Sequence, residues 1–111
     1  MTTAQFVTKD SGSRQTFRSG MVRDTQEGKP DYTLIDRDFL RRWAELMGRG
    51  VAKYGRDNWR QANSVEELER FRASALRHMF QWLNGDEEED HCAAIAFNVA
   101  AACYVEGKLR D

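Results

Sequence analysis

The sequence predicts an all-α protein, in which a long antiparallel helical hairpin and one further amphipathic helix form a bundle that oligomerisation completes. Two patterns support this fold class. Apolar residues recur at three- and four-residue steps from Asp36 onward, and a helix-capping signal and an Asn-Gly pair frame a second such run. Strand-like alternation of useful length and internal repeats are absent from the sequence. At 111 residues, the chain has the length of one domain with an adequate but not generous core.

The first 30 residues differ in composition from the rest of the chain. They are rich in Thr, Ser, Gly, Gln and charge, show no sustained hydrophobic period, and end at the only proline, Pro30. We therefore expect a flexible N-terminal arm over residues 1–30 and a helical domain over residues 31–111. The arm lacks the apolar core of a signal peptide, and no run approaches the roughly 20 apolar residues that span a bilayer. These features favour a cytoplasmic protein.

The first helix is expected to start near Asp36. Its arginines take one face, and its apolar residues take the other: Phe39, Leu40, Trp43, Leu46, Met47, Val51 and Tyr54. Gly48, Gly50 and Gly55 weaken or end a helix, so we expect residues 48–59 to be a helix end that runs into a loop.

The second and third helices are expected to form the hairpin. Ser64 and Glu67 make a capping box at the start of the second helix, and Asn84 with Gly85 ends it. The third helix, over residues 90–107, is rich in Ala and apolar almost all the way round, which predicts burial on every side. Covering it within one chain of this length is difficult, so we expect a homodimer or a homotetramer.

Charge and cysteine content narrow the classes of partner. The net charge is −1 and the pI is about 6.1, so no general basic field favours a stable complex with nucleic acid or a membrane. Cys92 and Cys103 lie eleven residues apart on one expected helix, roughly 16 Å at about 1.5 Å per residue, too far for a mutual disulfide. We expect both to be reduced core thiols.

Five consecutive acidic residues, Asp86 to Asp90, separate the second and third helices. One or two carboxylates at a helix N-terminus offset the helix dipole, at roughly 0.3 to 1 kcal/mol each, but five exceed this need. On a helical backbone Glu87, Asp90 and His91 stand at i, i+3 and i+4 and share one face. Oxygen-rich clusters suit a hard cation such as Mg²⁺ or Mn²⁺, so Asp86, Glu87 and Asp90 are candidate metal ligands.

Polar groups on the two hairpin helices are candidates for the same site. If the hairpin centre lies near Glu87, His78 lies between the levels of His91 and Asn98. A single histidine on an apolar helix is more often a satisfied core residue, and a single asparagine is more often a packing feature. Asn98 needs a partner, because burying an unsatisfied amide costs about a few kcal/mol. Because the two histidines are expected to converge with the acidic turn, we take His78, His91 and Glu89 as candidate catalytic residues.

Cationic and aromatic residues of the sequence offer contacts for a phosphate and for a base. They offer positive charge for phosphates and faces for stacking, although most such side chains are merely solvated. The candidate substrate-binding residues are Lys53, Tyr54, Asn58, Trp59, Arg77 and Asn98. A P-loop, zinc-spaced cysteines and a glycine-flanked serine nucleophile are missing from the sequence, so covalent catalysis has no good candidate.

Three pieces, GRGVAKYGRDNW, SALRHMFQWLNGDEEEDH and AAIAFN, resemble the phage and prophage family of dATP/dGTP diphosphohydrolase N-terminal domains. This family is similar to the all-α MazG-like nucleotide pyrophosphohydrolases, and the resemblance covers about residues 17–105. It implies a helical oligomer that hydrolyses a (deoxy)nucleoside triphosphate, a purine dNTP such as dGTP or dATP. The implied products are the monophosphate and pyrophosphate, and the implied cofactor is Mg²⁺ or Mn²⁺.

The metal motif of the MazG-like relatives is only partly matched. In those proteins an E-E-x-x-E motif is followed by E-x-x-D, and Glu87-x-x-Asp90 fits the second element. In the first element Glu66 and Glu67 are followed by Arg70 where the final Glu belongs. Two other functions therefore stay open, namely a nucleotide-binding sensor and a non-catalytic module whose acidic turn docks on a basic partner.

Overall fold

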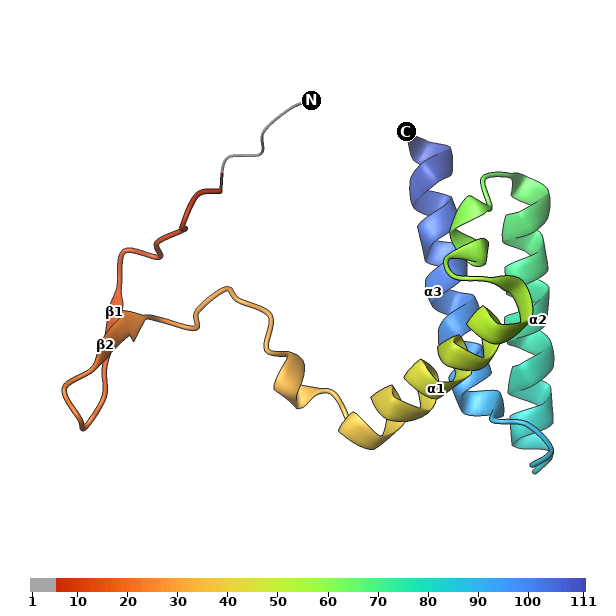
Figure 1. Ribbon diagram of the computed structural model, residues 1–111, viewed down its shortest axis with the longest axis horizontal. Helices are drawn as coiled ribbons and strands as arrows, with labels where there is room; N and C mark the ends of the chain where they lie inside the picture. The colour runs from red at the N-terminus through yellow and green to blue at the C-terminus, as the bar shows by residue number, and fades with distance from the viewer. Residues whose placement is uncertain (1–5) are drawn as a thin grey trace. The chain divides into compact units, whose positions relative to one another are not determined.

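The computed structural model describes residues 6–111. Contacts divide the chain into two compact units, one that ends at Leu34 and one that spans Ile35–Asp111. The larger unit is a helical bundle, which confirms the predicted helical class. The smaller unit contains a short sheet that the sequence patterns did not predict (Figure 1).

The short sheet is a two-stranded hairpin. Strand β1, Arg14–Thr16, pairs antiparallel with strand β2, Val22–Asp24. The carboxylate of Asp24 accepts a hydrogen bond from the backbone N–H of Ser11 at 3.0 Å. A short 3-10 helix, η1, follows at Tyr32–Leu34. Strands of three residues are too short to show alternation, and polar contacts hold this hairpin in place of an apolar core.

Helix α1 spans Arg37–Tyr54 and ends at Gly55, whose φ of 90° favours glycine. Of the three glycines expected to weaken or end the helix, only this one ends it. Gly48 and Gly50 lie inside α1, so the expected loop over residues 48–59 begins later than predicted. Each glycine costs a helix about 1 kcal/mol, and the packing of the apolar face outweighs that cost.

Helix α2 spans Val65–Leu83, and both of its predicted ends are confirmed. The Ser64 hydroxyl accepts a hydrogen bond from the backbone N–H of Glu67, and the Glu67 carboxylate accepts one from the N–H of Asn63 at 3.0 Å. Gly85 follows the helix with a φ of 83°. Another 3-10 helix, η2 at Asn58–Gln61, connects α1 to α2.

Helix α3 spans His91–Arg110, with Asp90 as its N-cap. The acidic residues before it are not helical, so the predicted helical face shared by Glu87, Asp90 and His91 is wrong. A cap residue has non-helical backbone angles, and here the turn reaches as far as that cap. At the other end, the helix passes through Gly107 before it stops.

The core of the bundle lies between α2 and α3, which run antiparallel, while α1 packs on α3 (Figure 1). Small side chains allow this close approach. The buried apolar residues are Ala62, Leu68, Ala93, Ala94, Ala101, Ala102 and Val105. The prediction that α3 is buried on all sides does not hold within one chain, because Val99 is half exposed and Cys103 is exposed. Oligomerisation stays a prediction.

The apolar character of α3 bears on the membrane question. By length and composition α3 is apolar enough to cross a membrane, contrary to the expectation from the sequence. The central helix of a soluble bundle has the same composition. Here α3 buries His91 and Asn98 as well as four of its alanines, and α2 packs along it.

Candidate functional site

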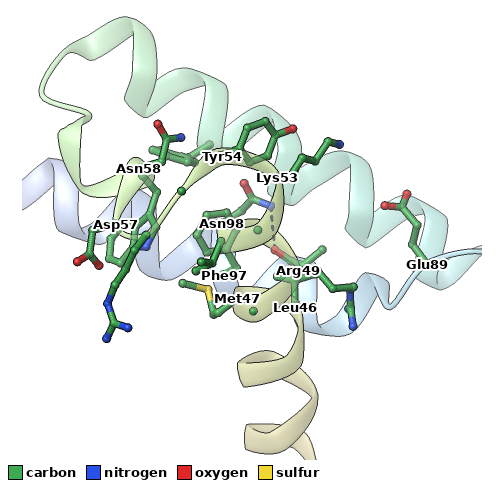
Figure 2. A pocket seen from close by; sticks show the side chains of 18 of the residues that line it. Leu46, Met47, Arg49, Lys53, Tyr54, Asp57, Asn58, Glu89, Phe97 and Asn98 are labelled. Atoms are coloured by element: carbon green, nitrogen blue, oxygen red, sulfur yellow. Dashed lines mark hydrogen bonds between the residues drawn. The ribbon is translucent and has the colours of Figure 1, made fainter.

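A pocket of about 800 Å³ lies beside the C-terminal half of α1. The loop after α1 and parts of α2 and α3 complete its walls, and it has the size of a small-ligand site. Its polar and aromatic lining includes Arg49, Lys53, Tyr54, Arg56, Asp57, Asn58, Trp59, His78, Glu89 and Asn98. Figure 2 shows Asp57 and Asn58 at one end and Glu89 at the other.

The pocket brings together most of the residues that the sequence suggested for substrate binding. Tyr54 is 62% exposed, so one face of its ring is free for a ligand. Asn98 is buried and donates a hydrogen bond from Nδ2 to the carbonyl of Ala94 at 2.8 Å. That bond gives the amide the partner it needs and leaves its oxygen free to accept. Arg77 is not among the lining residues of this pocket within residues 6–111.

Trp59 has a more structural position than its sequence context indicated. Its ring makes edge contacts with Phe97 and Tyr104, at centroid distances of 6.1 Å and 5.1 Å. The guanidinium of Arg60 lies over the same ring at 4.4 Å. Because these neighbours occupy Trp59, Tyr54 is the freer aromatic surface in the pocket.

Two buried histidines meet at the base of the site. The Nδ1 atoms of His78 on α2 and His91 on α3 are 2.9 Å apart. The Nε2 atom of His91 is 2.8 Å from a carboxylate oxygen of Glu88. Since a carboxylate accepts, Nε2 of His91 carries the proton and its Nδ1 presents a lone pair to His78.

The surroundings of His78 favour its neutral form. Burial of the imidazole lowers its pKa, and the positive charge of Arg77 lowers the pKa further. The carboxylates of Glu89 and Glu88 oppose this effect. His78 therefore stays uncharged at neutral pH, and it lies in the pocket wall where it can accept a proton.

Two of the three expected metal ligands are held by donors within the protein. Asp90 accepts the N–H of Ala93 and two hydrogen bonds from Arg42, at 2.8 Å and 2.7 Å. The Arg42 guanidinium lowers the pKa of Asp90 to about 2. Asp86 accepts a hydrogen bond from the side-chain amide of Asn84 at 2.9 Å. Asp90 thus acts first as a helix cap and ion-pair partner.

The remaining carboxylates line a second, smaller cleft of about 510 Å³. Glu87, Glu88 and Glu89 lie there with Arg49. Glu89 and Arg49 also line the larger pocket, so the two openings share a border. Exposed carboxylates and a cation thus stand together at the end of the pocket that Glu89 marks.

Two residues of this site were missing from the candidates drawn from the sequence. Glu88 was the only member of the acidic run without an assigned role, although its i, i+3 spacing to His91 could have suggested the contact. Arg42 gave no local signal, because its partner Asp90 is 48 residues away. Only the packing of α1 on α3 brings this pair together.

The fold and site define a small all-α domain with a nucleotide-sized pocket next to a histidine and carboxylate cluster. Residues 19–111 match the model of a family described as dATP/dGTP diphosphohydrolase, N-terminal, and the chain belongs to this family. The resemblance seen in the sequence is thereby confirmed. Neither curated proteins nor solved structures include a match to the chain. The family name indicates a diphosphohydrolase and refers to its N-terminal part.

Proposed function

We propose that this chain hydrolyses a purine deoxynucleoside triphosphate, dGTP or dATP, to the monophosphate and pyrophosphate. It would do so in the cytoplasm, as a homo-oligomer and with Mg²⁺ or Mn²⁺. The observation that carries the proposal is a pocket of about 800 Å³ with an exposed aromatic ring, Tyr54, beside the ammonium of Lys53, and with further cations and a carboxylate in its wall. The family name supports the same reaction class.

Base recognition falls to the part of the pocket around Tyr54. Its exposed ring offers a stacking surface of the kind that contributes about 1 to 3 kcal/mol per base. The oxygen of Asn98 can accept a hydrogen bond from an exocyclic amino group or a sugar hydroxyl. An acceptor fixed in this way favours ligands that carry a matching donor.

The cations of α1 and the following loop would receive the triphosphate. Arg49, Lys53 and Arg56 line the pocket, and Arg49 also lines the cleft that contains the acidic turn. In a partly enclosed site their charges stabilise the negative charge that develops on the leaving pyrophosphate. Lys53 is shown in Figure 2 above Asn98, between Tyr54 and Glu89.

The carboxylates at the Glu89 end fit a hard divalent cation. Glu87 and Glu89 are exposed, whereas the charge of Asp90 is already balanced by Arg42. Oxygen donors of this kind are those that Mg²⁺ and Mn²⁺ prefer. Such an ion, when bound, neutralises phosphate oxygens and makes its bound water more acidic. His78, which burial keeps neutral, is placed to take up the proton of the attacking water.

The test is an assay that separates pyrophosphate release from phosphate release across the eight common NTPs and dNTPs. We expect metal-dependent pyrophosphate release, strongest with dGTP or dATP and abolished by chelator. Glu89→Gln should reduce kcat at least tenfold, while Glu69→Gln, an exposed residue of α2 that lines neither pocket within residues 6–111, serves as the matched control. No release from any nucleotide by the folded protein would contradict the proposal.

A nucleotide-binding sensor is the second candidate. The occupied carboxylates of Asp86 and Asp90 favour it, because they reduce the number of ligands free for a catalytic metal. A sensor would bind dGTP or dATP in a calorimetric titration and release no pyrophosphate. The enzyme would do both.

A further inference from the structure

We propose that His78, His91 and Glu89 form a transition-metal site that prefers Mn²⁺ and Co²⁺ over Mg²⁺. Each residue offers one ligand atom, and these atoms all lie within 4.8 Å of one another. Two imidazoles and one carboxylate differ from the all-oxygen set considered above, and nitrogen ligands favour transition metals. The site is defined by metal binding alone and does not depend on the proposed hydrolysis.

The spacing of the two rings fits adjacent positions on one ion. A metal–nitrogen bond of about 2.0 to 2.1 Å places two ligands at right angles about 2.9 Å apart, and tetrahedral ligands about 3.3 Å apart. The Nδ1 atoms of His78 and His91 are separated by 2.9 Å. The separation of the two nitrogens therefore fits two neighbouring ligands of one ion.

Glu88 prepares His91 to act as a ligand. Metal-bound histidines generally donate their other ring N–H to a carboxylate or carbonyl, which fixes the tautomer and the ring orientation. The Nε2 atom of His91 lies 2.8 Å from Glu88, and this contact leaves the Nδ1 lone pair directed at His78. His91 is 3% exposed, so the ring is also held by packing.

His78 provides the opposing nitrogen. Without a metal, its Nδ1 donates a proton to Nδ1 of His91, since one of two nitrogens at 2.9 Å must carry hydrogen. Metal binding displaces that proton from Nδ1 to Nε2 of the same ring, so His78 binds as a neutral imidazole and no proton is released overall. On the other side of the His78 ring, the Arg77 guanidinium is 3.5 Å from Nε2, which is too long to fix that nitrogen as an acceptor.

Glu89 would complete the protein ligands from the solvent side. Its side chain is exposed, so it can rotate towards the two rings without disturbing the core. Both Glu89 and His78 line the large pocket. An ion held by these three side chains would keep further positions for water or for oxygens of a bound ligand.

The chain has only two histidines, which makes the test direct. Co²⁺ is added to the full chain at pH 7.5 and followed by calorimetry and by NMR of the imidazole nitrogens and ring N–H protons. We expect one ion per chain, no net release of protons because both imidazoles bind in their neutral forms, and large paramagnetic shifts of both rings. Mg²⁺ at the same concentration should leave both rings unshifted.

Variants assign the ligands. Glu89→Gln should weaken Co²⁺ binding at least tenfold, and Glu88→Gln should weaken it about 10- to 100-fold by releasing the ring of His91. Glu69→Gln, an exposed residue of α2 outside both pockets, should bind like the wild type. His78→Asn should abolish Co²⁺ binding. If the His78→Asn protein does not fold, Glu89→Gln still tests the site, because the side chain of Glu89 is exposed and its replacement should leave the fold intact.

Three results would overturn the metal site: no Co²⁺ or Mn²⁺ binding by the folded chain, binding that leaves both imidazoles unshifted, or equal ring shifts with Mg²⁺. These results are distinct from those for hydrolysis. Pyrophosphate release with Mg²⁺ and no Co²⁺ binding would refute this site alone. Co²⁺ binding at both rings without pyrophosphate release would refute the hydrolysis alone.

Discussion

Arg42 on α1 holds Asp90, the N-cap of α3, through two hydrogen bonds of 2.8 Å and 2.7 Å. The same carboxylate accepts the backbone N–H of Ala93 and so begins the helix. This pair joins the first helix to the acidic turn, immediately before His91. The contact therefore sets the position of the turn that carries Glu88 and Glu89.

Loss of either partner should destabilise the bundle. Asp90→Ala removes both the cap and the ion pair, and the cap alone contributes about 1 kcal/mol. Asp90→Asn keeps a capping oxygen and should lose less. Arg42→Ala should lower the free energy of unfolding more than Arg41→Ala, because the contacts of Arg41 are exposed and no shorter than 3.8 Å. Equal losses for the two arginines in urea unfolding would contradict the importance of this pair.

Two glycines should respond in opposite directions to alanine. Gly55 has a φ of 90°, which an L side chain rarely adopts, so Gly55→Ala should destabilise by about 1 to 2 kcal/mol. Gly107 is inside α3 with nothing within 4 Å of an added Cβ, so Gly107→Ala should stabilise by about 1 kcal/mol. Thermal unfolding of both variants tests whether Gly55→Ala lowers the stability and Gly107→Ala raises it. A stabilised Gly55→Ala protein would disprove the assigned end of α1.

Substrate affinity should depend on the ring of Tyr54 and less on its hydroxyl. Tyr54→Ala should raise KM roughly tenfold through loss of stacking, whereas Tyr54→Phe should stay within about twofold of the wild type. Tyr104→Phe is a suitable control, because Tyr104 packs on Trp59 and does not line the pocket in the described residues. Steady-state kinetics with dGTP and dATP measure the effect. An unchanged KM for Tyr54→Ala would remove Tyr54 from the base site.

The N-terminal hairpin should lose order in acid. Hydrogen bonds from the Ser11 hydroxyl and N–H, together with Lys29, lower the pKa of Asp24 to about 2. A carboxyl group with a lowered pKa stabilises the fold above its unfolded pKa, near 3.9, and this contribution disappears as the pH falls through about 2. NMR signals of the two strands should therefore weaken between pH 4 and pH 2. Asp24→Asn should weaken them already at pH 7.

The helical part of the fold was predictable because its signals are local. The Ser64 and Glu67 box and the Asn84-Gly85 stop depend on residues within one or two turns, and both were placed correctly. The start of α3 was placed within one residue, but the helical face that reached back to Glu87 was wrong, since the acidic residues before Asp90 are equally compatible with a helix and with a turn. Their real conformation depends on Arg42, which is distant in the sequence.

The candidate site was only partly accessible to the same reasoning. Residues close together in the sequence, such as Lys53, Tyr54 and Asn58, do line one pocket. The direct contact of His78 with His91 depends on the register of α2 against α3. The hairpin centre assumed from the sequence, near Glu87, placed His78 only between the levels of His91 and Asn98 and did not predict this contact. Arg77 precedes His78 and is not among the described lining residues of the pocket, although its guanidinium is 3.5 Å from Nε2 of His78.

Helix α1 supplies one wall of the pocket, yet it packs mainly on α3 and over a shorter stretch than α2 does. The α2 and α3 pair is joined by a short turn, so these helices can associate early in folding and separate last. Local opening should therefore cost least in α1, where amide hydrogens should exchange soonest. We therefore expect the α1 side of the pocket to open more readily than the side formed by α2 and α3. A large ligand would then enter by displacing α1 and would leave the α2 and α3 pair undisturbed.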